Sequence, residues 1–370
     1  MERPIFKPIG TPVVDLDTPA LVIDLDILEQ NLTTVHTFFQ RCHAKLRPEV
    51  STHGCPALAH KQIAAGGTVG GIAVATLGEA EVFVTHGIDD IVMTHPIVTR
   101  AKLQRLCALA RQGTMTVAVD HPTQVQQLTD AATANDVTIQ VAVTVETDAQ
   151  GWGIVPGPGV LDLIRAIEGA THLSFVGLIT TVGPVLAAQP QAVLAAQTRQ
   201  TLLPLVETYA QLERAGVEVS MVSVGGITMY EPVAALDGVT EVRLGTYAIM
   251  DAGHAPYAPS LHPAAHILTT VTSRPEPGTA ITDAGQKAVG IDLGLPVVRD
   301  GPGIAAMALS AEHCRLGLAD EVQATVALGD RLWLTPWDIG TCMNLYDAVY
   351  GARHGRLEVV WPISARGRYR

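Results

Sequence analysis

The sequence is poor in aromatic and charged residues and has few basic ones. Of its 370 residues, 4% are aromatic, 16% are charged and 48% are hydrophobic, so aliphatic side chains must form most of the core. The formal net charge is −12, and the basic residues are scattered apart from Arg366, Arg368 and Arg370. Without a larger basic patch the chain cannot neutralise a nucleic-acid backbone, which argues against a nucleic-acid partner.

Cysteine pairs and long apolar runs are also missing. The five cysteines include no CxxC pair, a pattern typical of reduced thiols rather than of a disulfide framework. No run of 18 uncharged apolar residues occurs, and the first ten residues, MERPIFKPIG, contain no apolar signal segment. We therefore expect a soluble, cytoplasmic protein with no membrane partner.

The central part of the sequence alternates short apolar runs with longer segments rich in alanine, leucine and glutamine. This alternation predicts strand and helix units in turn, with helices over 121–132 and 191–215. Eight parallel strands favour an α/β fold of the closed (β/α)8 TIM barrel type, although an open sheet remains an alternative. The predicted strands cover 46–50, 71–75, 90–94, 115–119, 138–145, 173–180, 219–224 and 241–246.

The last hundred or so residues have a different pattern, with frequent proline and glycine between short β-prone runs. They predict a second, mostly β C-terminal domain made of 253–370 and 1–17, beside a barrel domain over 18–252. The segment 252–264 is the expected hinge. An apolar run over 18–26 precedes a helix predicted over 27–41, which Asp26 can cap. The β-prone runs are 265–273, 279–283, 322–327, 331–335 and 357–361.

Several motifs resemble the D-serine dehydratase and D-threonine aldolase family, whose N-terminal domain is similar to alanine racemase. Residues 47–56 read RPEVSTHGCP where that family has RPHAKTHKCP, and 241–251 read EVRLGTYAIMD where it has ELRPGTYVFMD. A third motif, DAGQKAVGID over 283–292, resembles DAGSKALSSD. The resemblance extends from Thr18 to the WPISARG motif that begins at Trp361. It implies an alanine racemase-like barrel of fold type III, the fold of one class of pyridoxal phosphate enzymes.

The first motif departs from the family at its reactive residue. The family's lysine forms the Schiff base with pyridoxal phosphate, and Ser51 stands in its place, with Glu49 for the preceding histidine and Gly54 for the following lysine. A hydroxyl cannot form an imine. The cofactor, if any, is therefore unknown, and pyridoxal phosphate is not expected to bind covalently at Ser51. Lys287, in the third motif, is the first candidate if a displaced amine is needed.

The metal motif of the family is altered as well. Metal-dependent members carry Pro-Asn-His-x-Cys/Asp, whereas residues 336–340 read PWDIG, so that Asp338 replaces the histidine and Gly340 the second ligand. One carboxylate makes no metal site, because a closed site needs three or four donors. We therefore predict no metal.

Further positions that the resemblance assigns to the cofactor cavity are partly kept and partly changed. Gly225, Gly226 and Thr228 follow the seventh predicted strand and could still bind a phosphate or another anion through backbone N–H groups. Arg243 and Tyr247 match the family and would line the cavity, or else simply pair and pack. The changed residues are Thr76 for a lysine, Trp152 for an arginine, and Thr181 within a loop that loses Tyr, Glu and His. The residues LGEAE over 77–81, directly after Thr76, match the family unchanged.

The changes gather at the expected barrel mouth, which indicates a rebuilt cavity, and three functions stay open. The first is an enzyme of altered, lyase-like or isomerase-like chemistry on a small polar or amino-acid-like substrate, with Glu49, His53 and Asp338 as acid–base candidates. The second is a non-catalytic binding protein that holds a phosphate-bearing or other planar ligand. The third is an enzyme that uses pyridoxal phosphate non-covalently or through Lys287. The resemblance also implies a homodimer.

Overall fold

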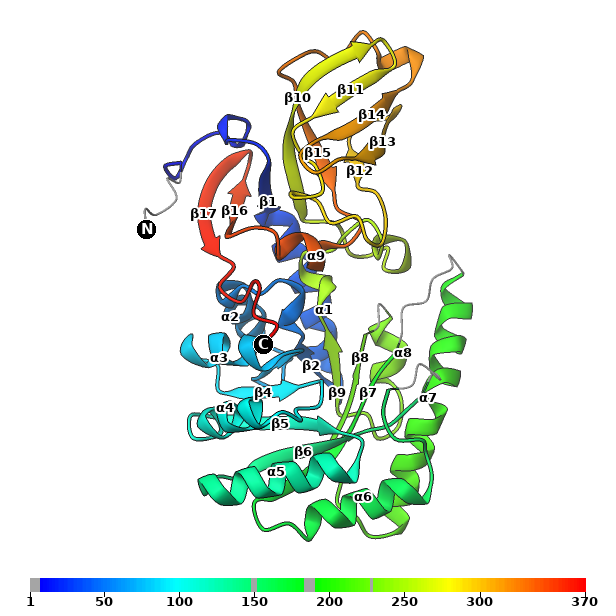
Figure 1. Ribbon diagram of the computed structural model, residues 1–370. Coiled ribbons are helices and arrows are strands. Elements are labelled where there is room, and N and C mark those ends of the chain that lie inside the picture. The colour runs from blue at the N-terminus through cyan, green and yellow to red at the C-terminus, as the bar shows by residue number, and fades with distance from the viewer. Residues whose placement is uncertain (1–6, 148–151, 183–189, 227–228) are drawn as a thin grey trace. The chain divides into compact units, whose positions relative to one another are not determined.

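The structure is a computed structural model that describes residues 7–147, 152–182, 190–226 and 229–370. The chain packs into two compact units (Figure 1). The barrel unit comprises Val35–Ser51, Leu58–Gly245 and Gly367–Arg370. The β-rich unit comprises Met1–Thr34, Thr52–Ala57 and Thr246–Arg366. No helix among the described residues has the length and apolar character needed to cross a membrane.

The barrel unit is a sheet of eight parallel strands in the order β2-β9-β8-β7-β6-β5-β4-β3. Isolated bridges from Leu46 to Thr68 and from Glu49 to Ala73 bring β2 and β3 together, so the barrel is nearly closed. The predicted (β/α)8 fold is confirmed. The strands are β2 (Lys45–Pro48), β3 (Ile72–Val74), β4 (Asp90–Met93), β5 (Thr114–Val119), β6 (Ile139–Thr144), β7 (Leu173–Thr181), β8 (Met221–Gly225) and β9 (Glu241–Leu244).

Helices follow most strands of the barrel, and their sequences explain where they begin. α3 starts with a capping box, in which the Thr76 side chain accepts from the Glu79 N–H and the Glu79 side chain bonds back to Thr76. α5 starts with a proline at its first position after His121. The helices are α1 (Leu25–Arg41), α2 (Pro56–Ala64), α3 (Leu77–Thr85), α4 (Arg100–Ala110), α5 (Pro122–Asn135), α6 (Pro158–Glu168), α7 (Gln191–Arg214) and α8 (Tyr230–Ala234).

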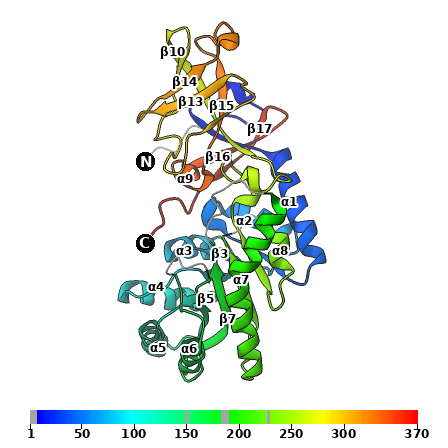
Figure 2. The same cartoon turned by 90° about the vertical axis from the view of Figure 1, so that its right-hand side faces the viewer.

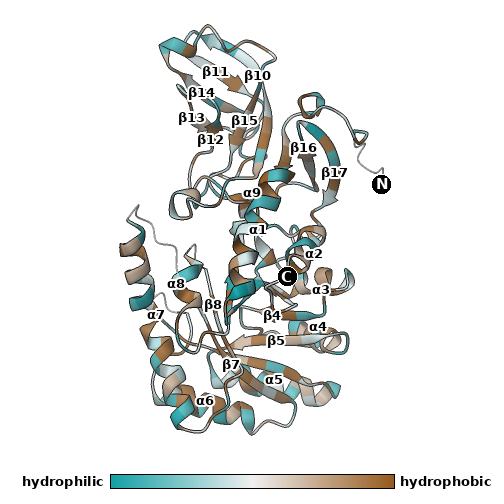
Figure 3. Ribbon diagram, turned by 180° about the vertical axis from the view of Figure 1, so that it is seen from behind, coloured by the Kyte–Doolittle hydropathy of each residue, from teal (hydrophilic) through white to brown (hydrophobic). Residues whose placement is uncertain are grey.

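Small and medium apolar side chains fill the barrel, as the low aromatic content requires. Six consecutive strands, β3 to β8, each contribute one buried member of a single cluster, and hydrophobic residues run along strands such as β5 and β7 (Figure 3). Alanines at three of these places leave room for the side chains of neighbouring strands to interdigitate. The cluster consists of Ala73, Val92, Ala118, Ala142, Ile179 and Met221.

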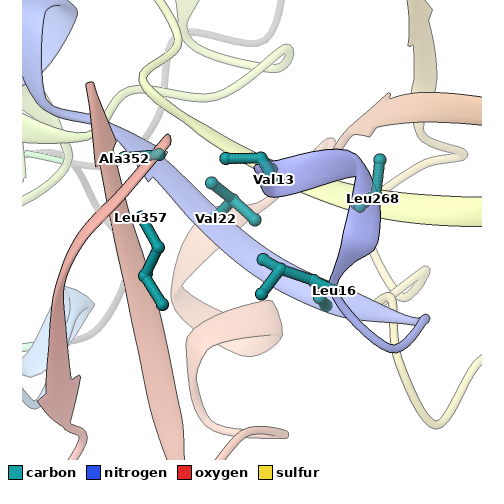
Figure 4. Packing of buried hydrophobic residues seen from close by; sticks show 7 residues of the cluster. Val13, Leu16, Val22, Leu268, Ala352 and Leu357 are labelled. Atoms are coloured by element: carbon teal, nitrogen blue, oxygen red, sulfur yellow. The ribbon is translucent and has the colours of Figure 1, made fainter. Parts of the chain in front are cut away.

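The β-rich unit contains a nine-stranded sheet in which the N-terminal strand β1 (Ala20–Asp24) is central. β1 pairs antiparallel with β10 and parallel with β16. Its Val22 packs with Val13, Leu16, Leu268 and Leu357 in a buried cluster (Figure 4). The other strands are β10 (Ala265–Glu276), β11 (Thr279–Thr282), β12 (Val297–Arg299), β13 (Ile304–Leu309), β14 (Cys314–Leu318), β15 (Arg331–Thr335), β16 (Ala348–Arg353) and β17 (Arg356–Pro362).

A second, mostly β domain was correctly predicted, but some of its elements were not. The segment 322–327 is not a strand, because it follows a 3₁₀ turn at Asp320–Val322 and its Val326 carbonyl bonds the Arg274 side chain instead of a neighbouring strand. Strands β12, β13, β14 and β16 were not predicted. Packing divides the chain somewhat differently from the predicted limits, 18–252 against 253–370 with 1–17, since β1 belongs to the β-rich sheet. The predicted domain limits, 18–252 and 253–370 with 1–17, follow the resemblance and stay a prediction.

His266 on β10 is a buried titratable group whose ring is bonded on both sides. Nε2 lies 3.0 Å from the Pro263 carbonyl and Nδ1 lies 2.9 Å from the Thr335 hydroxyl. A carbonyl only accepts, so Nε2 carries the proton and Nδ1 accepts from Thr335. Burial, with a contribution from the charge of Arg299, lowers the pKa of His266 to about 4.

We expect His266 to make the fold acid-sensitive between pH 6.5 and 4. The unfolded chain binds the imidazole proton near pH 6.5 and the folded chain near 4, so stability present at neutral pH is lost as the pH falls, by about 3 kcal/mol. Urea unfolding at several pH values should show a smaller decline for His266→Gln than for the wild type. The exposed His43, changed to Gln, is the control. Parallel declines in wild type and His266→Gln would contradict the assignment.

Candidate active site

The polar side chains at the carboxyl ends of the barrel strands form the candidate site. In a (β/α)8 barrel this end carries the reactive groups, because the loops after all strands meet there. Glu49 directly follows β2, where its N–H bonds the Leu244 carbonyl of β9 at 2.8 Å and its backbone bridges to Ala73 of β3. The backbone of Glu49 is therefore fixed on the seam that closes the barrel.

Ser51 lies in the 3₁₀ turn Val50–Thr52, and its hydroxyl is held by two partners. The hydroxyl accepts from the Ala75 N–H at 2.8 Å and donates to Glu79 Oε2 at 2.9 Å. Both partners come from the end of β3 and the start of α3. Ser51 is thus bonded to a carboxylate at the position where the resemblance places a lysine.

Glu79 is the buried acid of this part of the site. Its Oε2 also accepts from the backbone N–H groups of Ala75 and Thr76, at 3.1 and 2.9 Å. Burial raises the pKa of Glu79, and the hydrogen bonds from Ser51, Thr76 and Ala75 lower it by less. Glu79 was not among the predicted site residues. The T-x-x-E pattern of residues 76–79 predicts a helix cap, but it does not reveal the bond to Ser51.

Arg243 of β9 is a fully buried cation whose side chain reaches toward β7 and β8. Nη1 donates to Ser223 Oγ at 2.9 Å, and Nη2 donates to the Thr180 carbonyl at 2.8 Å and to Thr181 Oγ1 at 3.0 Å. Nε lies 4.0 Å from Glu49 Oε2, and no acceptor among the described residues bonds it. Burial lowers the pKa of Arg243, and the nearby Glu49 carboxylate opposes this shift.

The two glycines at the end of β8 leave space for this arginine and for the neighbouring backbone. A Cβ on Gly225 would lie 2.5 Å from Arg243 Nη2, so a side chain there would displace the guanidinium. Gly226 has a φ of +74° and would place a Cβ 2.5 Å from the Val182 carbonyl oxygen. Thr228 lies outside the described residues. Anion binding at this turn stays a prediction.

Trp152 and His95 of the barrel unit contact each other through their rings. The Trp152 side chain is 61% exposed, and its ring meets that of His95 edge to face with centroids 5.6 Å apart. A cavity of about 220 Å³ lies nearby, with His95, Thr76 and Lys102 among its lining residues. Its walls include Ala75 and Leu77, so it adjoins the backbone that holds Ser51 and Glu79.

Three predicted site residues belong to the β-rich unit, where each has a local role. His53 is buried, and its Nδ1 accepts from the Cys55 N–H at 3.0 Å. Asp338 caps α9 (Ile339–Met343) by accepting from the Thr341 N–H at 2.7 Å. Tyr247 is buried in the 3₁₀ turn Thr246–Ala248. Their catalytic or binding roles stay predictions.

The residues present do not fit a lysine-bound cofactor at position 51, where the family has its Schiff-base lysine. Ser51 offers a hydroxyl that is already bonded on both sides. Lys287 is 74% exposed and pairs with Glu312 at 2.6 Å in the β-rich unit. Lys45 donates to two carbonyls, those of Phe39 and Cys42. Lys102, on α4, lines the cavity at the rim, and the two remaining lysines are Lys7 and Lys61.

Metal ligands are likewise not gathered in the part of the chain that the structure describes. There, no group of three or more histidine, cysteine, aspartate or glutamate side chains could hold a metal ion. Gly340 has no donor atom, and the Asp338 carboxylate is engaged in capping α9. The described side chains at these two positions therefore do not fit the metal site of the metal-dependent family members.

Comparison with known proteins agrees with this architecture. Residues 23–252 match the alanine racemase N-terminal domain, and residues 264–352 match a putative serine dehydratase domain. The chain is 33% identical to a D-threonine aldolase of Arthrobacter sp. over 97% of this chain and 95% of that protein. It is 29% identical to a 3-hydroxy-D-aspartate aldolase of Paracoccus denitrificans, over 97% and 94%.

A solved structure, that of D-threonine aldolase from Filomicrobium marinum, superposes with a TM-score of 0.93 at 32% identity. The superposition covers 98% of this chain and 99% of the aldolase chain. The matched domains and the identity over nearly the full length establish the relationship that the motifs suggested. The chain belongs to the D-threonine aldolase and D-serine dehydratase family, with an alanine racemase-type barrel of fold type III.

Proposed function

We propose that this protein is a lyase-like or isomerase-like enzyme that acts on a small, amino-acid-like substrate by acid–base catalysis, without pyridoxal phosphate bound covalently at position 51. Relatives named as aldolases support a lyase-like activity on this scaffold. A cytoplasmic location, expected from the sequence, and a homodimer, implied by the resemblance, are part of the same proposal.

One observation carries the proposal: residues that depart from the family pattern contact residues that match it. Glu49 and Thr181 both depart, and both lie against Arg243, at 4.0 and 3.0 Å. Ser51 and Thr76 both depart, and both use their side chains on Glu79: the Ser51 hydroxyl donates to its carboxylate, and the Thr76 hydroxyl accepts from its N–H. Random loss of function would leave such substitutions without partners. Two sets, each joined around a matching charged residue, support a site rebuilt for other chemistry.

The Arg243 set supplies the elements of acid–base catalysis. The guanidinium is fixed by three strong hydrogen bonds, so its positive charge is held in place before any substrate arrives. A fixed cation stabilises negative charge that develops on a substrate carboxylate or carbonyl oxygen. Glu49, on the neighbouring strand end, can accept a proton from the substrate and return it. His53 and Asp338 remain the further acid–base candidates of the proposal.

A pyridoxal-dependent reaction through Lys287 has less support. That side chain is exposed and already paired with Glu312, whereas an imine-forming lysine needs a desolvated, uncharged amine. A non-catalytic binding protein is the other alternative, and it would keep the anion site predicted at Gly225 and Gly226. Reduction in the presence of pyridoxal phosphate and deuterium exchange at the substrate Cα distinguish these two alternatives from the proposed reaction.

We expect the purified protein not to form a specific imine with pyridoxal phosphate. After incubation with the cofactor and borohydride reduction, intact mass should show no stoichiometric adduct, because the position equivalent to the family's lysine carries a hydroxyl. Ser51→Lys, which returns an amine to that position, is the positive control and should gain both an absorbance band and an adduct. A stoichiometric wild-type adduct on Lys287 would overturn this part of the proposal.

We expect Glu49→Gln to slow proton transfer strongly while the protein stays folded. The assay follows solvent deuterium entering Cα by NMR, with D-threonine and 3-hydroxy-D-aspartate among the compounds tested. The rate should fall by about 100-fold or more, the usual contribution of a general base. Glu168→Gln, at an exposed helix end, is the matched control. Unchanged exchange in Glu49→Gln would refute its role, and binding without exchange in the wild type would favour a non-catalytic protein.

A further inference from the structure

The starts of α3 and α4, two helices that lie side by side in the barrel unit, line the cavity of about 220 Å³ (Figures 1 and 2). Five of its eight lining residues are apolar. The volume is below the range of about 300 to 1,000 Å³ that whole drug-sized ligands occupy. The cavity therefore fits a short, largely apolar molecule, or one end of a longer one.

Lys102, in the first turn of α4, carries the one formal charge among the described residues that line the cavity. Its side chain is half-buried, and in the described part of the chain its ammonium has neither a hydrogen-bond acceptor nor an ion-pair partner. α4 has no acidic residue in its first turn, and the positive end of the helix dipole disfavours a cation there. Helix stability therefore does not explain a lysine at this position.

The two carboxylates of α3 do not supply a counter-charge, because each is engaged elsewhere. Glu81 is bonded by Arg105 at 2.6 and 2.7 Å. Glu79 accepts from the Ser51 hydroxyl and from two backbone N–H groups. Neither carboxylate is part of the lining. The positive charge at the cavity is therefore not compensated by α3.

His95 adds a second polar group whose position is fixed by its neighbours. Its Nδ1 lies 3.1 Å from the Thr94 hydroxyl, and its ring meets the Trp152 ring edge to face. The other ring nitrogen, Nε2, has no partner among the described residues. A ligand anchored by Lys102 can therefore meet a further hydrogen-bonding group at His95.

We propose that this cavity binds a small carboxylate, which pairs with the ammonium of Lys102 while its apolar chain packs against Leu77, Met93 and Ile97. The carboxylate accepts charge-assisted hydrogen bonds from the ammonium, and the apolar lining removes the chain from water. Inorganic phosphate has no apolar chain and gains only the first of these contributions. The lining therefore selects organic acids over free phosphate.

The site deepens the proposed function by naming a substrate class. Ala75 lines the cavity, and its N–H donates to Ser51 Oγ at 2.8 Å. This step rests on the proposed function: the bound carboxylate is then the end of the substrate that is remote from the reacting atoms. The substrate class is narrowed to amino-acid-like molecules that carry a second acidic group on a short apolar chain.

Methionine methyl NMR tests the site, because Met93 is the one methionine of eight in the lining. The protein is labelled with ¹³C in its methionine methyl groups, and Met93→Leu identifies the signal. Isovalerate should shift that signal to saturation. Isoamylamine, which has the same branched chain but a positive charge, should not, and neither should inorganic phosphate. Met307, exposed on β13 of the β-rich unit, is the internal reference.

Variants at Lys102 test the charge. Lys102→Gln should weaken isovalerate binding by about tenfold or more, the effect of losing one charge-assisted hydrogen bond. Lys102→Arg keeps the charge and should retain binding. Lys61→Gln, which removes an exposed lysine from α2, is the matched control and should bind isovalerate as the wild type does.

No saturable shift of the Met93 signal would refute the site, and so would equal affinity for isovalerate in Lys102→Gln and the wild type. Equal binding of isoamylamine would show an apolar cavity without charge selection and would overturn the proposal as well. Neither readout needs a substrate. Binding that depends on Lys102, with no deuterium exchange in any compound tested, would leave the site standing and refute the proposed reaction.

Discussion

The burial of Arg243 is the constraint around which the mouth of this barrel is organised. A guanidinium with no exposure must be paired or hydrogen bonded, because an uncompensated buried charge costs several kcal/mol. Ser223, Thr180 and Thr181 supply acceptors from β7 and β8, and Glu49 supplies the counter-charge from β2. Gly225 has no side chain because the guanidinium fills that space.

This constraint links substitutions that are far apart in the sequence. Glu49 and Thr181 replace residues of other chemistry in the family pattern, yet they serve one cation. Ser51 and Thr76 are joined in the same way through Glu79, whose carboxylate accepts from the Ser51 hydroxyl and whose N–H donates to the Thr76 hydroxyl. The altered positions therefore form two bonded sets rather than a scatter of single changes. Selection for a folded scaffold alone would not require that arrangement.

The barrel could be predicted from the sequence, because its eight strands are short apolar runs separated by long helical segments. The β-rich unit was predicted less well. In β13, IAAMAL, alternation is hidden by small apolar residues on both faces, and β16 contains a glycine and an arginine. Segment 322–327 has the right composition for a strand, but a 3₁₀ turn precedes it and Arg274 takes its carbonyl. Whether such a segment becomes a strand depends on hydrogen bonding to a partner strand, which is often far away in the sequence.

The candidate site shows the same limit. Ser51 and Arg243 were singled out from their motifs, whereas Glu79 was missed although its T-x-x-E cap is visible in the sequence. A capping box is a local signal. The bond between Ser51 and Glu79 joins residues 28 positions apart in the sequence and forms only when β2 and β3 lie side by side. Asp338 is the reverse case, since a residue chosen for chemistry also serves as a helix cap.

Two arginines on the closing seam of the barrel are bonded at opposite ends of its strands. Arg47 of β2 and Arg243 of β9 are partners in register, but their side chains reach opposite ends. Arg47 bonds Glu241 and Asp90, at the start of β9 and β4, so its charge is neutralised at the amino ends of the strands. Arg243 bonds the carboxyl ends of β7 and β8, and its Nε lacks an acceptor among the described residues.

The fully paired arginine stabilises the scaffold, whereas the other retains bonding capacity at the end where barrel enzymes place their chemistry. Leaving a buried donor unsatisfied costs about 1 to 3 kcal/mol. A scaffold selected for stability alone would have relieved that cost with one more acceptor, as it did for Arg47. The incomplete pairing of Arg243, whose Nε lies 4.0 Å from Glu49 Oε2, is therefore the feature of the seam that stability alone does not explain.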